Sequence, residues 1–201
     1  MSILQSIKPQ YCELIASGKK TIEVRKTRPK LQTPFKVYIY CTIGQRIPNG
    51  FGGVSEALKQ PLWKLRNGTV VNYLDVETMD VFQCEKLNGK VIGEYVCDYI
   101  IPVFSRSRFW ITDENLSAMC MSYLDISKYA GGALNLYGWH ISDLKIYDKP
   151  NELGEFVKYG YEQDYAEWEH YSIAGVNGKE PNTDDYKLTR PPQSWCYVEE
   201  V

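Results

Sequence analysis

The residues best suited to chemistry lie in one short run, Lys20-Thr-Ile-Glu-Val-Arg25. Successive side chains of a β-strand point to opposite sides of a sheet, so Thr21, Glu23 and Arg25 would share one face. That face would carry a hydroxyl, a carboxylate and a guanidinium about 6.6 Å apart along the backbone. Such a row can bind a polar ligand, and Lys20 adds a positive charge at its start.

A helix over residues 9–17 is expected to position this strand. Pro9 suits the first turn of a helix, because its missing N–H group would be unpaired there in any case. Gly18 follows apolar residues at helical spacing and is a typical stop signal. A helix start presents free N–H groups and a partial positive charge, so Lys8 beside it is a candidate phosphate contact. The alternative is that Lys8 is simply solvated.

The same region is a concentrated basic patch. Six of the twelve residues from 19 to 30 are lysine or arginine, against one acid, Glu23. The whole chain has a formal net charge of -2 and a pI of about 5.8, so it has no overall electrostatic attraction to nucleic acid or acidic membranes. Any such binding must come from this patch, whose alternative interpretation is a solvated strand face. Within the patch, Lys20 is expected to be exposed.

Residue periodicity predicts the other elements. The expected strands cover residues 1–8, 35–43, 90–103, 133–146 and 195–198. The expected helices cover residues 112–122, capped by Thr112 or Asp113, and 161–171, and a further turn at 124–129 ends at Gly131. Residues 45–88 are rich in turn signals and are interpreted as an insertion, with a short helix at 54–64 and a hairpin at 70–84.

Four motifs, in this order along the chain, resemble the ASCH family of the PUA-like superfamily. They are Leu4-Gln-Ser-Ile-Lys-Pro9 with Gly18-Lys-Lys-Thr-Ile-Glu-Val-Arg25, Gly89-Lys-Val-Ile-Gly-Glu-Tyr95, Leu136-Tyr-Gly-Trp-His-Ile141, and Arg190-Pro-Pro-Gln-Ser-Trp-Cys-Tyr197. The last two resemble the long form found in bacterial and prophage genomes. The resemblance implies an α+β fold with a small curved β-barrel flanked by short helices. It also implies a single domain over residues 1–201, with an insertion at about 45–88 and an elaborated C-terminal extension at about 150–190.

A nucleobase site needs a flat apolar surface for stacking, polar groups for the base edge and positive charge for phosphate. The candidates are Tyr137, Trp139 and Trp195 for stacking, Thr21, Glu23, Gln193 and Ser194 for the base edge, Lys8, Lys20, Arg25 and Arg190 for phosphate, and His140 beside them. Two prolines before Gln193 should hold it and Ser194 in a fixed extended geometry. We therefore expect RNA or a nucleotide to bind in a cleft with basic and aromatic walls. Core packing is the alternative for each aromatic residue.

An enzyme is the competing class. Some ASCH-like proteins are amidohydrolases of acetylated cytidine that use a lysine, a threonine and a distal glutamate. Lys20 matches the lysine, but Glu23 occupies the position of the threonine, and Glu114 is only a candidate for the distal acid. A carboxylate can act as a general base on water but cannot replace a hydroxyl nucleophile. Lys20 and Glu23 would be the catalytic pair if the chain is an enzyme.

Two further alternatives remain open. A ribonuclease with a two-histidine mechanism would need the fold to bring His140 and His170 together, although His140 is also suited to a hydrogen-bonded core position. An adaptor would contact a protein partner through the tyrosine-rich extension at 150–190. This third class predicts no ligand in the cleft.

The six cysteines form no Cys-x-x-Cys pair, so neither zinc nor another cofactor is expected. Cys12, Cys41 and Cys97 have apolar or aromatic neighbours and suit the core. The chain begins without a signal-peptide pattern, and no apolar run approaches the roughly 18 residues of a membrane span. We expect a cytoplasmic location with reduced thiols and no membrane contact.

Overall fold

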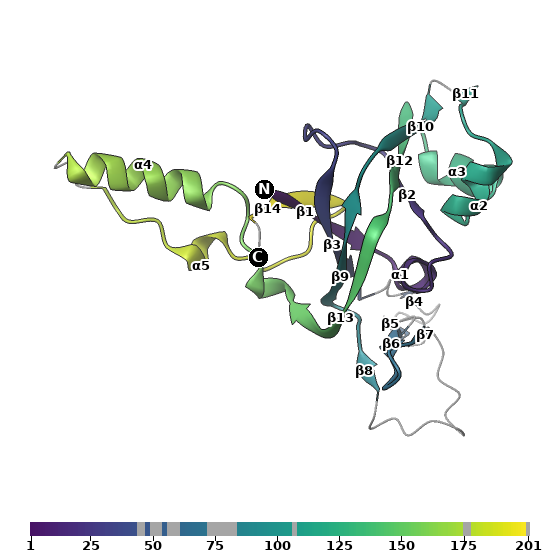
Figure 1. The fold of residues 1–201 in the computed structure, drawn as a ribbon, viewed down its shortest axis with the longest axis horizontal. Helices are drawn as coiled ribbons and strands as arrows, with labels where there is room; N and C mark the ends of the chain where they lie inside the picture. Colours follow the sequence, from purple (N-terminus) through teal and green to yellow (C-terminus); the bar gives the residue numbers. More distant parts are fainter. Residues whose placement is uncertain are drawn as a thin grey trace.

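The structure is a computed structural model that describes residues 1–43, 47–48, 54–55, 61–71, 84–105, 108–174 and 178–199. Two β-sheets form the body of the molecule (Figure 1). The first has the strand order β13-β9-β3-β1-β14 and the second the order β11-β10-β12-β2. The bounds are β1 Ser2–Ile7, β2 Ile22–Arg25, β3 Phe35–Cys41, β9 Lys90–Cys97, β10 Ile100–Ser105, β11 Arg108–Phe109, β12 Asn135–His140, β13 Ser142–Glu152 and β14 Trp195–Val198.

Strand pairing brings the two ends of the chain together. The N-terminal strand β1 lies parallel to β3 on one side and antiparallel to the C-terminal strand β14 on the other. In the second sheet, β2 pairs antiparallel with β12, and Glu23 lies opposite Trp139. The two sheets are open in the part of the chain that the structure describes, so the barrel expected from the family resemblance is not confirmed.

Five α-helices are described, and three of them surround the charged strand. Helix α1 Pro9–Ala16 connects β1 to β2, while α2 Asp113–Met119 and α3 Tyr123–Ala130 pack beside β2 and β12. Thr112 caps α2 through the backbone N–H of Asn115, and Gly131 ends α3 in the left-handed conformation. These two helix boundaries confirm the sequence-based ones.

Apolar packing holds the two sheets together. Ile3 of β1, Ile39 of β3 and Ile92 of β9 belong to the same buried cluster as Trp139 of β12. A separate cluster joins β2 and β12 to α2 and α3, through Ile22, Val24, Leu136, Met119 and Ile126. Ile22 and Val24 thus face the helices, as the alternation predicted, and their polar neighbours face the other way.

Two long predicted strands are each divided. Residues 90–103 form β9 and β10, which belong to different sheets, and residues 133–146 contain β12 and the start of β13. Strand-forming residues lie on both sides of each crossing, so the residue types do not reveal that the chain changes sheets. Gly93 of β9 has a separate packing role, because the backbone of β13 at Lys145 passes too close for a Cβ atom there.

The insertion contains only two-residue strands among its described residues. They are β4 Ile47–Pro48, β5 Val54–Ser55, β6 Trp63–Lys64, β7 Val70–Val71 and β8 Glu85–Lys86. The expected helix at 54–64 is therefore wrong at both ends, where strands lie, and its middle falls outside the described residues. Most of the expected hairpin at 70–84 also lies outside them. Leu62 and Leu87 are buried in the main apolar cluster and anchor the insertion.

The C-terminal extension projects from the body (Figure 1). It contains the 3-10 helix η3 Leu153–Glu155, α4 Tyr161–Ile173 and α5 Thr183–Tyr186. Helix α4 confirms the prediction for residues 161–171. None of the helices in the described residues has the length and apolar character needed to cross a membrane.

Candidate functional site

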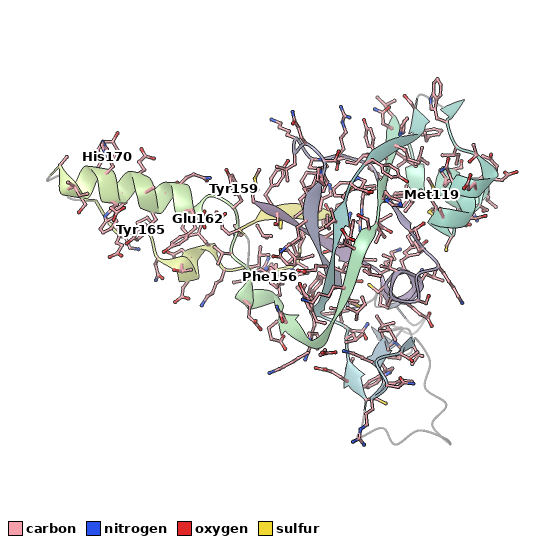
Figure 2. The ribbon with its side chains drawn as sticks, viewed as in Figure 1. Met119, Phe156, Tyr159, Glu162, Tyr165 and His170 are labelled. Carbon is pink, nitrogen blue, oxygen red and sulfur yellow. The ribbon has the colours of Figure 1, made fainter. Side chains whose placement is uncertain are left out.

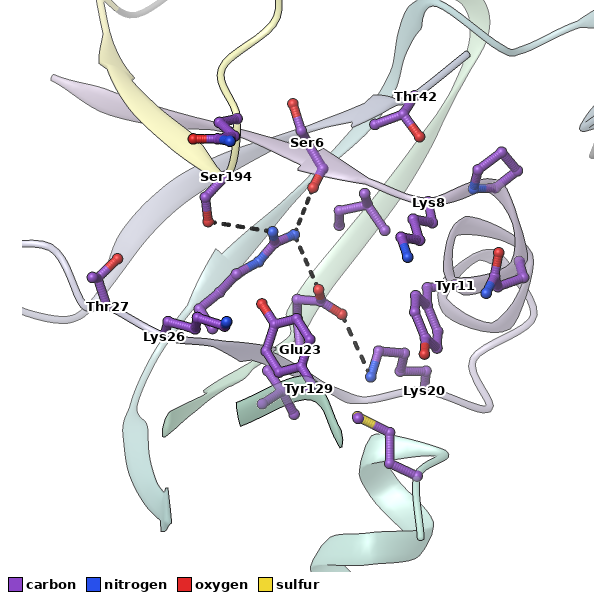
Figure 3. Close-up of a pocket in the computed structure, with 17 residues that line it drawn as sticks. Ser6, Lys8, Tyr11, Lys20, Glu23, Lys26, Thr27, Thr42, Tyr129 and Ser194 are labelled. Carbon is purple, nitrogen blue, oxygen red and sulfur yellow. Dashed lines mark hydrogen bonds and ion pairs between the residues drawn. The ribbon is translucent and has the colours of Figure 1, made fainter. Parts of the chain in front are cut away.

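A pocket of about 880 Å³ opens where β1, α1 and β2 meet the segment that leads into β14 (Figure 3). Its walls come from four separate parts of the chain: residues 6–11, residues 20 and 23–27, Met121 with Tyr129, and Gln193 with Ser194. Thr42 completes the lining. Segments nearly the whole chain length apart therefore build this one cavity.

Three charged side chains lie buried at the floor of the pocket (Figure 3). Glu23 Oε2 is 3.4 Å from Lys20 Nζ, and Glu23 Oε1 is 3.0 Å from Arg25 Nη2. Lys20 is only 2% exposed, and Glu23 and Arg25 are each 6% exposed. We call these three residues the charged triad. It carries a formal charge of +1.

Hydrogen bonds to the surrounding backbone make this burial possible, because a buried charge without partners is strongly destabilising. Lys20 Nζ donates to the carbonyl oxygen of Met119 at 2.6 Å, and Arg25 Nη2 donates to that of Ser6 at 2.8 Å. The Lys20 ammonium also lies 5.1 Å from the centre of the Tyr11 ring. Arg25 Nε is buried and has no hydrogen-bond partner among the described residues.

The burial of Lys20 corrects the expectation that it is exposed. Its backbone N–H donates to Leu14 at the end of α1, and its ammonium reaches the end of α2. Gly18, with φ of 71°, makes the turn between α1 and this segment. The acceptor on Met119 lies 99 residues away along the chain, so a local sequence pattern could not reveal it.

The rim of the pocket adds exposed positive charge and aromatic surface. Lys8 and Lys26 are exposed, and they raise the formal charge of the pocket lining to +3. Tyr11 and Tyr129 supply two rings, and Lys26 Nζ lies 5.5 Å from the centre of the Tyr129 ring. Burial raises the pKa of both tyrosines, and the Glu23 carboxylate also raises that of Tyr11. Both hydroxyls therefore stay protonated near neutral pH.

The opposite wall is tied to β1. The backbone N–H of Ser6 donates to the carbonyl of Ser194 at 2.9 Å, and the Ser6 hydroxyl donates to the carbonyl of Pro192 at 2.7 Å. Arg25 Nη1 in turn donates to the Ser194 hydroxyl at 3.5 Å. Gln193 and Ser194 thus lie beside the triad, in a segment that Ser6 holds through hydrogen bonds to two backbone carbonyls.

Six of the twelve candidate residues from the sequence lie together in this pocket. They are Lys8, Lys20, Glu23, Arg25, Gln193 and Ser194. The other six, Thr21, Tyr137, Trp139, His140, Arg190 and Trp195, are not part of its lining. The structure therefore brings together the charged and amide side chains but not the tryptophans.

The two tryptophans pack against each other at a tilted angle instead. Trp139 is fully buried, with its ring centre 5.7 Å from that of Phe35 and 5.9 Å from that of Trp195. The Trp195 indole N–H donates to the Thr27 hydroxyl at 3.0 Å. A fully buried ring cannot stack on a ligand, so the role of Trp139 in this structure is core packing.

The remaining candidates lie elsewhere. His140 Nδ1 is 2.6 Å from an Asp98 carboxylate oxygen, and its ring stacks on Tyr99 at 4.3 Å. Arg190 is exposed, and Thr21 is bound through its backbone to Ala118. His170 belongs to α4 on the extension, well separated from the body strand that carries His140 (Figures 1 and 2).

Sequence reasoning missed the two tyrosines of the pocket. Tyr11 was visible only as part of an apolar helix stripe, and Tyr129 lies more than a hundred residues from the charged strand. For Tyr11, its position one helical turn from Lys8 is a usable signal, because residues three apart share a helix face. For Tyr129 there is no such signal in the sequence, since only the packing of α3 brings this residue to the pocket.

Neither the family models nor the curated proteins contain a match to this chain. Among solved structures, the crystal structure of ASCH from Zymomonas mobilis is similar, with 15% identity, a TM-score of 0.48, and coverage of 99% of this chain and 88% of that chain. Two mutant forms of the same protein give 14% identity, TM-scores of 0.47 and 0.49, and coverage of 99% of this chain and 91% and 89% of theirs. These structural neighbours carry the family name that the sequence motifs resemble. The likeness is distant, and no activity is transferred from it.

Proposed function

We propose that the chain binds RNA or a nucleotide-like ligand in the pocket above the charged triad. The observation that carries this proposal is the combination in one cavity of a net positive charge, two aromatic rings and a buried unpaired donor. These are the three kinds of group that a nucleotide requires. The family resemblance of the sequence motifs implies the same class of ligand.

The phosphate is assigned to the rim. Lys8 lies at the start of α1, where the first-turn N–H groups and the helix dipole favour an anion. Lys26 also lines the pocket and supplies a second exposed ammonium group. The overall charge of -2 makes binding depend on these local groups, so affinity should fall as salt concentration rises.

The base is assigned to the interior of the pocket. Tyr129 offers a partly exposed ring for stacking, and Arg25 Nε, Gln193 and Ser194 offer polar groups for the base edge. The volume of about 880 Å³ is typical of pockets for small molecules. A mononucleotide or one flipped base of a single strand suits this size better than a duplex does.

The test is titration of the purified full chain with short single-stranded RNA and with mononucleotides at low and high salt. Lys26→Ala should reduce the affinity and weaken its salt dependence. Tyr129→Ala should lower the affinity by about 1–3 kcal/mol if the ring stacks on a base, whereas Tyr129→Phe should retain most of it. Lys149→Ala is the matched control, because this exposed lysine lies on β13 outside the pocket. Equal losses in Lys149→Ala and Lys26→Ala would contradict the proposal.

The same titration tests the enzyme alternative. Ionisable groups buried beside a cavity are a frequent feature of active sites, and Glu23 is such a group. Against this role, the carboxylate is engaged by Lys20 on one side and Arg25 on the other. Recovery of the RNA and mononucleotides after incubation shows whether any has been hydrolysed. If the parent chain hydrolyses a nucleotide and Glu23→Gln does not, the chain would be a hydrolase and not a binding protein.

A further inference from the structure

The C-terminal extension forms an arm that has little contact with the rest of the molecule. We define the arm as residues 160–187, which contain α4 and α5. In α4, every side chain is exposed except Tyr161, Tyr165 and Trp168, which are half-buried. These three lie at helical spacing and face the returning segment, where Tyr161 packs on Tyr186 and the Trp168 indole N–H donates to the carbonyl of Gly178. The side of α4 about a quarter of a turn from these rings carries Glu162, Glu169 and Ile173, which are all exposed, and we call it the free face.

The free face combines acidic and apolar side chains. Glu162, Glu169 and Ile173 are seven and four residues apart, so they share one side of the helix. Ile173 is 83% exposed, the largest exposed fraction among the large apolar residues of the described chain. An exposed isoleucine on the same side as two carboxylates is suited to a partner surface that is basic and partly apolar.

The charge of the arm identifies what that partner can be. The arm contains seven acidic and two basic residues, which gives a formal charge of -5. Residues 8–30, which build α1, β2 and the pocket rim, contain seven basic and two acidic residues, a charge of +5. Nucleic acid and acidic membranes would be repelled by the arm, whereas the basic segment of the same chain is its electrostatic complement.

The two complementary regions cannot easily meet within one molecule. The arm extends from one end of the body, while α1 and α2 lie toward the other end (Figure 1). Glu162, Tyr165 and His170 on the arm are far from Met119, whose carbonyl binds Lys20 of the triad (Figure 2). The complement must therefore come from another molecule.

We propose that the arm of one copy docks on the basic segment of a second copy. Glu162 and Glu169 face the exposed lysines of the pocket rim, Lys8 and Lys26, and Ile173 covers the apolar part of the pocket lining. A reciprocal contact of this kind closes a twofold dimer, because each copy supplies one arm and one basic segment. The proposed dimer contact and the proposed nucleotide site share the pocket rim, but the dimer proposal does not depend on nucleotide binding.

The primary measurement is the oligomeric state of the purified full chain as a function of concentration and salt, by sedimentation equilibrium. We expect a monomer–dimer equilibrium that shifts toward monomer at high salt, because exposed charges are screened. Glu162→Lys/Glu169→Lys should weaken the dimer by about tenfold or more, since like charges then face each other. A chain that stays monomeric at all concentrations would overturn the proposal.

The matched control reverses the same number of charges elsewhere on the arm. Glu180→Lys/Asp185→Lys changes two exposed acids of the returning segment and leaves the free face of α4 intact. This variant should retain most of the dimer. Equal weakening by both variants would overturn the assignment of the contact to the free face.

A charge exchange identifies the second surface. Lys8→Glu/Lys26→Glu should also dissociate the dimer, and mixing it with Glu162→Lys/Glu169→Lys should restore association between the two variants. Failure of the mixture to associate would exclude the pocket rim as the docking surface. Added mononucleotide should dissociate the parent dimer if both proposals hold. If the chain forms the dimer but binds no nucleotide, only the proposed nucleotide-binding function is refuted.

Discussion

The pocket and the arm both carry several charged side chains but hold them in opposite ways. In the pocket, Lys20, Glu23 and Arg25 are at least 94% buried and are tied to one another and to backbone carbonyls. On the arm, the acidic side chains of α4 are exposed, and one of them, Asp164, accepts a hydrogen bond from Tyr186. Burial makes the position of a charge costly to change, whereas exposure leaves a charge free to act on another molecule.

Removal of Glu23 should have the largest effect on folding. In Glu23→Ala, two positive charges would remain buried without their shared carboxylate, so we expect a loss of about 3–5 kcal/mol in the free energy of unfolding. Urea denaturation measures this loss. The matched change on the arm is Glu167→Ala. It should change the free energy of unfolding by less than about 0.5 kcal/mol, because the side chain is exposed. Similar losses in the two variants would contradict the difference between the buried charges of the pocket and the exposed charges of the arm.

Removal of Lys20 should have a smaller but clear effect. Lys20→Ala leaves the Met119 carbonyl without its donor, while Glu23 keeps Arg25 as a partner. We expect a loss of about 1–3 kcal/mol in the free energy of unfolding, as for a buried group that loses its hydrogen bond. Lys19→Ala is the neighbouring exposed control. If the two lysine variants have equal denaturation midpoints, the burial of Lys20 does not contribute to stability.

Alkaline pH should produce a smaller effect, to which a thiol of the body contributes. Burial raises the pKa of the Cys196 thiol from its ordinary value of 9 to about 11. A thiol with a raised pKa binds its proton more tightly when folded, so its stabilising contribution is complete below pH 9 and is lost as the pH rises through about 11. On the arm, the pKa of Tyr186 is raised chiefly by its hydrogen bond to Asp164 and not by burial.

Thermal melts across this pH range, with Cys196→Ser beside the parent chain, measure the contribution of the thiol. The variant should lose less stability between pH 9 and pH 11, because its hydroxyl does not ionise there. Cys120→Ser provides the control, since its thiol lies at the end of α2. An equally steep decline in all three proteins would show that Cys196 does not contribute. The decline that remains belongs to other buried groups with a raised pKa, such as Tyr95.

Local patterns predicted the parts of the site that depend on neighbouring residues. The alternation in residues 21–25 correctly placed Glu23 and Arg25 on the face opposite Ile22 and Val24. The stop at Gly18 also follows from one residue, because glycine adopts its φ of 71° without steric strain. These features were predictable because strand periodicity and turn geometry act over a few residues.

Patterns failed where the chain crosses between sheets. Residues 95–101 are all apolar or aromatic except Asp98, so residues 90–103 were expected to form one strand. Trp139 was a reasonable stacking candidate, but the face it shares with Glu23 also packs on Phe35 and Trp195. Which part of a face meets solvent depends on the second sheet, and a single strand carries no information about it.

The sequence by itself determined the charged strand, the helix that precedes it, and the separation of a basic segment from an acidic arm. These properties reside in residue types and short-range geometry. The tertiary structure alone decided that Lys20 is buried on Met119, that Tyr129 joins the pocket, and that the arm lies away from the basic segment. Each of these depends on contacts between residues far apart in the chain, which form only when the two sheets and the helices pack together.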